Sequence, residues 1–186
     1  MGSEHCLDVT KETENFLKHY ERLSRLPLIT DAEIAILFGN AVISILEKLD
    51  RYNLSEKLCA CCARRCCLLV DCELYSPEIK TCPVKSFRPL LCRMHYCHQF
   101  ASVYPVQVKE VGDLFLESLL AAERLDKEKA ALFDAPPLKR FAPGLVNTLE
   151  CLLADFKRGK SDEPTVLRLI QTEVAKYYQT ISPSLS

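Results

Sequence analysis

The sequence predicts an all-α protein, a helical bundle with a central Cys-rich, loop-containing metal-binding segment. Apolar residues outside the Cys-rich stretch recur at helical spacing. The chain contains only five glycines, and it shows none of the long alternation of Val, Ile and Thr that is typical of strands. Its length of 186 residues is about that of one domain. We therefore expect residues 1–186 to form a single, mainly helical domain that includes a Cys-rich metal-binding segment at residues 59–97.

The first half of the chain contains two predicted helices. The first is capped by Thr10 and ends before Pro27, and its apolar positions are Phe16, Leu17, Tyr20 and Leu23. The second begins at Thr30, which has the spacing of a capping box with Glu33. The apolar stripe behind this box runs to Leu49 and predicts one continuous helix that faces a core.

The second half of the chain predicts three further helices. The first spans about 106–132, with a break near Asp126. The connection 134–144 contains too many prolines to be helical throughout. A shorter helix at 145–156 precedes a last helix that has Pro164 near its first turn. The apolar stripes of these helices indicate core packing.

Composition and charge exclude several classes of protein. With 24 basic and 25 acidic side chains the net charge is −1, so we expect no nucleic-acid partner, which would require an excess of Lys and Arg. No run of about 18 apolar residues is present, so we expect no membrane span. The first residues are polar and acidic where a signal peptide would be basic and then apolar. The expectation is a cytoplasmic protein.

Nine of the 11 cysteines lie between Cys59 and Cys97. In a reducing compartment such crowding indicates a metal site rather than disulfides. Cys61 is interpreted as a packed thiol or a secondary ligand, and Cys6 and Cys151 stand apart from the cluster. The predicted metal ligands are Cys59, Cys62, Cys66, Cys67, Cys72, Cys82, Cys92 and Cys97.

The first group of cysteines fits one face of a helix. If residues 53–69 are helical, three side chains fall within about 60° of arc: those of Cys59, Cys62 and Cys66. Cys67 lies beside that face and Cys61 points nearly the opposite way. Three thiolates, or four, can therefore converge on one ion or cluster.

The second group consists of Cys82, Cys92 and Cys97, in a loop that two prolines hold extended. Cys72 lies between the two groups. His95 and His98 flank Cys97, so a Cys₃His site is also open. Nine cysteines allow at most two four-thiolate sites.

The residues alone are compatible with two cofactors, zinc and an iron–sulfur cluster. Structural zinc favours Cys₄ geometry and contributes roughly 10–16 kcal/mol in small domains, but zinc modules usually show two clean CxxC pairs. An iron–sulfur cluster also takes four thiolates and tolerates irregular spacing. Disulfides are a third possibility that cytosolic redox conditions oppose.

A motif in the second group resembles a known family. Cys82-x5-Arg88-Pro89-x2-Cys92-Arg93, which follows a compact group of cysteines, resembles the YkgJ-type zinc- or iron-chelating family, also called the CxxCxxCC family. The family pattern is C-x-x-Y-x-x-R-P-x-x-C-R, and this chain has Lys at the Tyr position. The upstream cysteines are spaced C-x2-C-x3-C-C, one residue longer than in the family. The resemblance covers about residues 59–97 and implies cysteine-bound iron or zinc. It favours an iron–sulfur cluster over zinc, and a 4Fe–4S cluster over other types.

Basic residues outnumber acidic ones by six to three between Cys59 and Cys97. Arg88 and Arg93 belong to the matched motif, and we expect them to lie beside the cofactor, where they would offset its negative charge and raise its potential. Tyr96 and Phe100 are expected to cover the cofactor. A solvated basic surface is the alternative interpretation of these charges.

The sequence thus predicts an iron–sulfur protein that transfers electrons or senses redox state as an accessory to a larger enzyme or other partner protein, rather than an enzyme itself. One alternative is a zinc-stapled protein-interaction module without a redox role. Another is a small lysine-methylase-like modifying enzyme, because one member type of the family is a flagellin lysine N-methylase. No segment of the chain has the pattern of an S-adenosylmethionine site.

Overall fold

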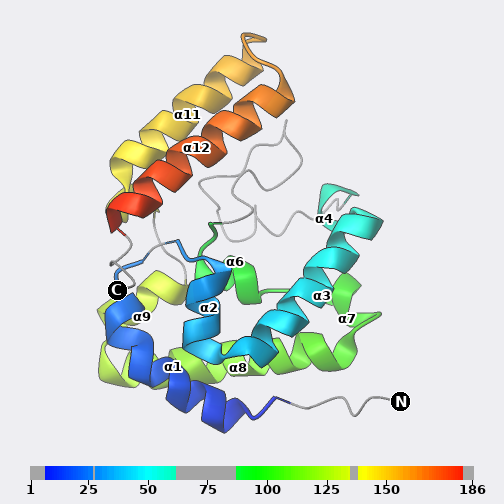
Figure 1. Cartoon of the computed structure of the whole chain (residues 1–186), viewed down its shortest axis with the longest axis vertical. Helices are drawn as coiled ribbons and strands as arrows, with labels where there is room; N and C mark the ends of the chain where they lie inside the picture. The colour runs from blue at the N-terminus through cyan, green and yellow to red at the C-terminus, as the bar shows by residue number, and fades with distance from the viewer. Residues whose placement is uncertain (1–6, 27, 62–86, 135–137, 182–186) are drawn as a thin grey trace.

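A computed structural model describes residues 7–26, 28–61, 87–134 and 138–181. Regular secondary structure within these ranges is helical, which confirms the predicted all-α class. The helices are α1 (Val9–Leu23), α2 (Asp31–Phe38), α3 (Asn40–Glu56), α4 (Leu58–Cys61), α6 (Leu90–Met94), α7 (His98–Ala101), α8 (Pro105–Leu125), α9 (Lys127–Asp134), α10 (Leu138–Phe141), α11 (Pro143–Lys157) and α12 (Glu163–Ile181). Figure 1 shows α11 and α12 as a pair of helices above the layer formed by the others. None of the described helices is long and apolar enough to cross a membrane.

The larger hydrophobic core joins α1, α2, α3, α6, α8 and α9. Three phenylalanines from different helices meet in it: the ring of Phe16 lies 5.3 Å from that of Phe38 and 5.6 Å from that of Phe133. All three are fully buried, and burial of such a side chain stabilises the fold by roughly 1.5–3 kcal/mol. This core fixes α2, α3 and α6 relative to one another, and those three helices carry Asp31, Asp50 and Arg93 of the candidate site.

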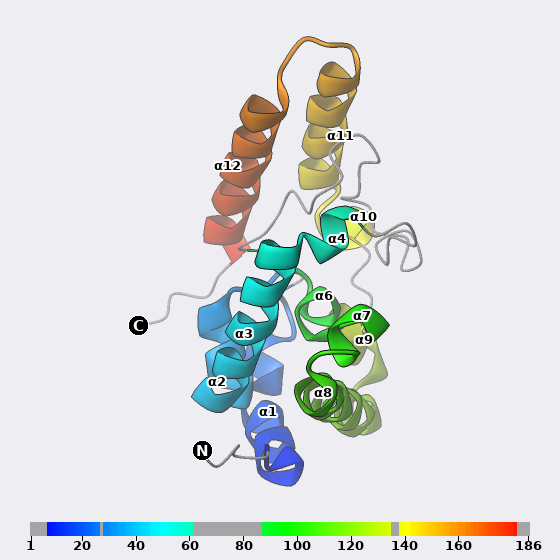
Figure 2. The ribbon, with the colours of Figure 1, turned by 90° about the vertical axis from the view of Figure 1, so that its right-hand side faces the viewer.

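A second core lies between α10, α11 and α12. Its buried residues on the two long helices are Leu145, Val146, Leu149, Leu153, Val166, Ile170 and Val174. Leu28 joins this cluster from the segment before α2, whereas its neighbour Ile29 belongs to the larger core. Successive side chains of an extended segment point in opposite directions, so two consecutive residues connect the two cores. Figure 2 shows the α11–α12 pair rising from the other helices.

Several predicted helix boundaries are confirmed. The capping box is present, because the Thr30 hydroxyl accepts from the backbone N–H of Glu33 and the Glu33 carboxylate accepts from the backbone N–H of Thr30. The predicted break occurs at Asp126, which separates α8 from α9 with an extended backbone. The last two predicted helices correspond to α11 and α12, and the Asp162 side chain accepts from the backbone N–H of Thr165 at the start of α12.

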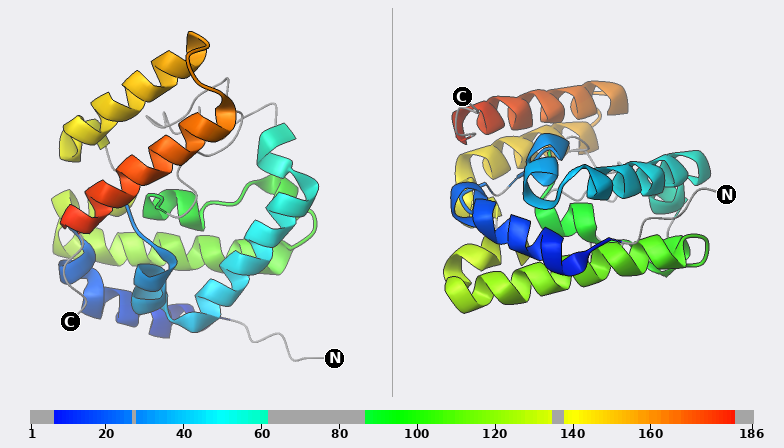
Figure 3. Two further views of the ribbon diagram at one scale, coloured as in Figure 1. Left: turned by 45° about the horizontal axis from the view of Figure 1, so that its top comes forward. Right: turned by 60° about the horizontal axis from the view of Figure 1, so that its bottom comes forward.

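The predicted continuous helix from Thr30 to Leu49 is divided in two. Gly39 ends α2 with a φ of +81°, a conformation that glycine adopts without steric cost, and α3 begins at the next residue. The apolar stripe continues on both sides of this break because both helices face the same core. Figure 3 shows the change of direction between α2 and α3.

Two other local predictions also differ from the structure. Asp8, not Thr10, caps α1: its carboxylate accepts from the backbone N–H of Lys11 at 3.1 Å. The hypothesised helix over 53–69 is interrupted at Lys57, which has a left-handed φ of 52° between α3 and α4. The part of that helix after Cys61 lies outside the described residues.

Candidate functional site

Three of the eight predicted metal ligands lie in the described part of the chain. Cys59 is exposed on α4, Cys92 is half-buried in α6, and Cys97 is half-buried at the residue before α7. Cys61, at the end of α4, is also exposed, so its interpretation as a packed thiol is wrong. The other five lie outside the described residues: Cys62, Cys66, Cys67, Cys72 and Cys82. Within residues 7–26, 28–61, 87–134 and 138–181, no three His, Cys, Asp or Glu side chains form a group that could hold a metal ion. The metal site therefore stays a prediction, and the described contacts concern the scaffold around it.

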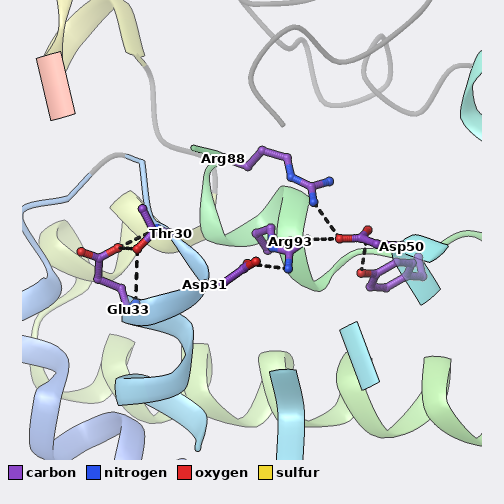
Figure 4. A network of polar contacts seen from close by, with 7 residues as sticks. Thr30, Asp31, Glu33, Asp50, Arg88 and Arg93 are labelled. Atoms are coloured by element: carbon purple, nitrogen blue, oxygen red, sulfur yellow. Dashed lines mark hydrogen bonds and ion pairs between the residues drawn. The ribbon is translucent and has the colours of Figure 1, made fainter. Parts of the chain in front are cut away.

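The Arg93 side chain lies in the protein interior, only 3% exposed, on the same side of α6 as the buried Leu90 and Met94. Its Nη1 donates to Asp50 on α3, and its Nη2 donates to Oδ1 of Asp31 on α2 at 2.7 Å. A buried cation is costly unless it is paired and hydrogen-bonded, and these two carboxylates meet that requirement. Arg93 thus attaches α6 to both α2 and α3, as Figure 4 shows.

Arg88, the other arginine of the motif, converges on the same carboxylate. Its Nη2 donates to Oδ2 of Asp50 at 3.1 Å. Its backbone forms the single described β-bridge, an antiparallel pair with Ile29 with N–O distances of 3.0 and 3.3 Å. The segment is therefore fixed through both its main chain and its side chain immediately before Pro89 and α6.

Asp50 accepts from a third side chain of the same segment. The Tyr96 hydroxyl lies 3.5 Å from Oδ1 of Asp50, a long contact, whereas the two arginines bond to Oδ2. Asp50 is consequently the shared acceptor for three donors spread over residues 88–96. Cys92 lies within that span and Cys97 directly follows it.

The electrostatics of this Arg–Asp anchor, defined by Asp31, Asp50, Arg88 and Arg93, are balanced. Burial lowers the pKa of Arg93, but the carboxylates, Asp50 above all, raise it by more, so the net shift of that pKa is upward. Burial, followed by the charge of Asp50, raises the pKa of Tyr96. Arg93 therefore stays cationic and Tyr96 stays neutral near pH 7. Two guanidinium groups face two carboxylates, so the anchor carries no net charge.

The predicted role of Arg88 and Arg93 beside a cofactor stays a prediction. The guanidinium ends of both side chains are bound to carboxylates. A solvated basic surface is wrong for these two residues, since both side chains are largely buried. Each buried Nε–H lacks a hydrogen-bond partner among the described residues. The Nε–H of each arginine is therefore not used by the anchor.

Cys59 is attached to the same helix as Asp50. Its backbone N–H donates to the side-chain Oδ1 of Asn53 at 3.0 Å, across the left-handed residue Lys57. Asn53 follows Asp50 by three residues on α3, so the two side chains share one face of that helix. One short stretch of α3 thus contacts both described cysteine-bearing segments.

Aromatic rings hold α7 against α3. Phe100 is buried, with its ring 5.0 Å from that of Tyr96 and 6.2 Å from that of Tyr52. Tyr104 also lies 5.2 Å from Tyr52 in an edge-to-face arrangement. These contacts fix the short helix that follows Cys97, while the expected covering of a cofactor by Tyr96 and Phe100 stays a prediction. The side chains of His95 and His98 are exposed.

Sequence reasoning missed the acidic half of the anchor. Asp50 lies four residues after Leu46 and eight after Val42, both fully buried on α3, so a carboxylate continues a row of core-facing residues. An acidic residue in such a row indicates a buried cation as its partner. That signal was available for Asp50, whereas Asp31, at the exposed first turn of α2, offered none.

Comparison of the chain with protein-family models, with curated proteins and with solved structures gives no match. A functional conclusion therefore depends on the residues and contacts described above.

Proposed function

We propose that the chain binds an iron–sulfur cluster through cysteines of segment 59–97 and transfers electrons or senses redox state as an accessory to a partner protein. The observation that carries this proposal is the Arg–Asp anchor around Cys92, in which the buried guanidinium of Arg93 is held by two partly exposed carboxylates. Burial of an arginine in such a pair contributes little net stability compared with apolar packing. Its use at this position indicates that the orientation of the segment matters more than its stability.

Ligand positioning explains why such an anchor is useful. A metal centre needs the side chains that coordinate it to be held in place by surrounding packed and hydrogen-bonded residues. Arg88 and Arg93 lie on either side of Cys92 and both end at Asp50, so the backbone around this thiol is fixed at two points. Cys97 is fixed in turn by the ring contacts of Tyr96 and Phe100.

The donor set fits an iron–sulfur cluster. Thiolates are its usual ligands, and Cys59, Cys92 and Cys97 are thiols at the surface or half-buried. When bound, the cluster would supply one-electron transfer. Because the anchor is neutral overall, the unused Nε–H donors of Arg88 and Arg93 are the part of it that could influence the potential, since hydrogen bonds to sulfur raise the potential of such clusters.

The first test is anaerobic purification followed by the visible spectrum and by analysis of iron, sulfide and zinc. The proposal predicts a brown protein with broad visible absorption and with iron and acid-labile sulfide in equal amounts. A colourless protein that contains zinc would overturn it and would favour the zinc-stapled interaction module. A protein without iron or zinc would overturn both.

A matched pair of cysteine variants then tests the ligand assignment. Cys92→Ser removes a half-buried thiol of the motif, and Cys151→Ser removes an exposed thiol on α11, far along the chain from it. The proposal predicts loss of most of the iron in Cys92→Ser and full iron content in Cys151→Ser. Equal iron content in the two variants would remove Cys92 from the ligand set.

A further inference from the structure

Two side chains of α3 connect to the two described groups of cysteines. Asp50 accepts from Arg88, Arg93 and Tyr96, the residues around Cys92 and before Cys97. Asn53 accepts from the backbone N–H of Cys59. Residues three apart on a helix lie about 5–6 Å from each other at their Cβ atoms, so both connections leave α3 from nearly the same place.

We propose that this Asp50–Asn53 face of α3 aligns the two cysteine-bearing segments with each other. Asp50 fixes the segment that carries Cys92 and Cys97, Asn53 fixes the turn that carries Cys59, and the rigid helix between them sets their relative placement. Both are positioning residues, not ligands. The purpose of the alignment rests on the proposed metal centre, but the alignment itself is a property of the metal-free chain and is tested separately.

The contacts single out Asp50 over the other carboxylate of the anchor. Asp50 lies on α3 and receives three donors, and its side chain is 30% exposed. Asp31 lies on α2, receives only Arg93 among the described residues, and its side chain is 63% exposed. Removal of the Asp31 charge leaves the connection between α3 and residues 88–96 in place. Asp31→Asn is therefore the matched control for Asp50→Asn.

The first measurement is the alkylation rate of single cysteines in the reduced, metal-free full chain. A maleimide reagent is quenched at intervals, and labelling is quantified for each peptide by mass spectrometry, with exposed Cys151 as the internal standard. Loss of a charge-assisted hydrogen bond raises the equilibrium constant for local opening of the segment about tenfold. Asp50→Asn is expected to raise the rates at Cys92 and Cys97 about tenfold, and Asp31→Asn less than about threefold.

The second measurement is the release of bound metal to an excess of chelator from protein purified without oxygen. Asp50→Asn and Asn53→Ala are both expected to release metal at least about fivefold faster than the unchanged chain, because either change frees one cysteine-bearing segment. Asp50→Glu keeps the carboxylate and is expected to restore slow release in part. If the unchanged chain contains no metal, the proposed function fails, while the alkylation rates still test the connection of Asp50 to the segment that carries Cys92 and Cys97.

A variant in the second core distinguishes a loss of alignment from a general loss of stability. Val174→Ala creates a cavity between α11 and α12, away from α3. If Asp50→Asn and Val174→Ala raise the Cys92 rate equally at equal melting temperature, the alignment role is overturned. If Asp50→Asn does not fold, Asn53→Ala carries the test, and metal release from Asn53→Ala as slow as from the unchanged chain would overturn the alignment role.

Discussion

The Tyr178 hydroxyl donates a hydrogen bond to the Glu33 carboxylate, which joins the last helix to the capping box of α2. Glu33 is only 1% exposed and also accepts from the backbone and the hydroxyl of Thr30. The Tyr178 ring lies 4.9 Å from that of Phe87. One tyrosine near the end of the chain therefore contacts both the start of α2 and the residue before Arg88.

Replacement of Tyr178 by Phe tests this connection. The change removes a hydrogen bond to a buried carboxylate and is expected to lower the free energy of unfolding by about 1.5–3 kcal/mol in urea titration. Tyr104→Phe is the matched control, because the Tyr104 hydroxyl has no hydrogen bond to any described residue while its ring contacts Tyr52. A loss in Tyr178→Phe no larger than in Tyr104→Phe would contradict the inferred attachment.

The break between α2 and α3 predicts opposite effects for two glycine replacements. Gly39→Ala places a side chain at a φ of +81° and brings its Cβ to about 3.2 Å from Oε2 of Glu12, so we expect a loss of roughly 1–2 kcal/mol. Gly112→Ala lies inside α8 with no neighbouring atom within 4 Å of the new Cβ. It is expected to stabilise the protein by about 0.5–1 kcal/mol. Melting temperatures that move in the same direction for both variants would be inconsistent with this view of Gly39.

The anchor predicts a difference between two arginine-to-lysine changes. Arg93→Lys keeps the charge but cannot reach Asp31 and Asp50 together, since a single ammonium replaces a planar fork. We expect it to cost about 2 kcal/mol or more in chemical denaturation. Arg51→Lys alters an exposed pair with Glu47 at 4.0 Å and is expected to change stability by less than about 0.5 kcal/mol. Similar stabilities of the two variants would show that the anchor contributes nothing specific.

Tyr20 predicts a loss of stability at alkaline pH. Burial, followed by the charge of Asp126, raises the pKa of Tyr20 to about 12 from its ordinary value of 10.0, and its hydroxyl donates to the Asp126 carbonyl at 2.9 Å. Because the folded protein holds this proton more tightly than the unfolded chain, the contribution is complete below pH 10 and is lost between about pH 10 and 12. The free energy of unfolding is measured by urea titration at pH 9 and at pH 11. Its decrease between these two pH values is expected to be smaller for Tyr20→Phe than for the unchanged chain. An equal decrease in the two proteins would exclude Tyr20 as a source of the loss of stability at alkaline pH.

Local signals in the sequence predicted the local features of the fold. The capping box at Thr30 and the break at Asp126 depend on neighbouring residues, and both are present. The break at Gly39 was missed because the apolar stripe continues across it: both helices face one core, so hydrophobic periodicity alone does not reveal the turn. The left-handed Lys57 was missed because a lysine gives no local signal for that conformation.

The candidate site was predictable only in its basic half. Arg88 and Arg93 were selected through the motif, but the partners of Arg93 lie 43 and 62 residues away in the sequence, at Asp50 and Asp31. Such pairs form when separate helices pack against each other, and the spacing of residues within one segment does not predict them. Five of the predicted cysteine ligands lie outside the described residues, and their role stays a prediction.

The alternation of Leu28 and Ile29 between the two cores has a consequence for how the protein unfolds. Ile29 is bonded to Arg88 through the main chain, and Arg88 is bonded to Asp50. Separation of the α11–α12 pair from the remaining helices would remove Leu28 from the second core and so disturb the segment that both cores share. Coupling of this kind favours cooperative unfolding of the two cores, so a ligand that stabilises the region around Cys92 is expected to raise the melting temperature of α11 and α12 as well.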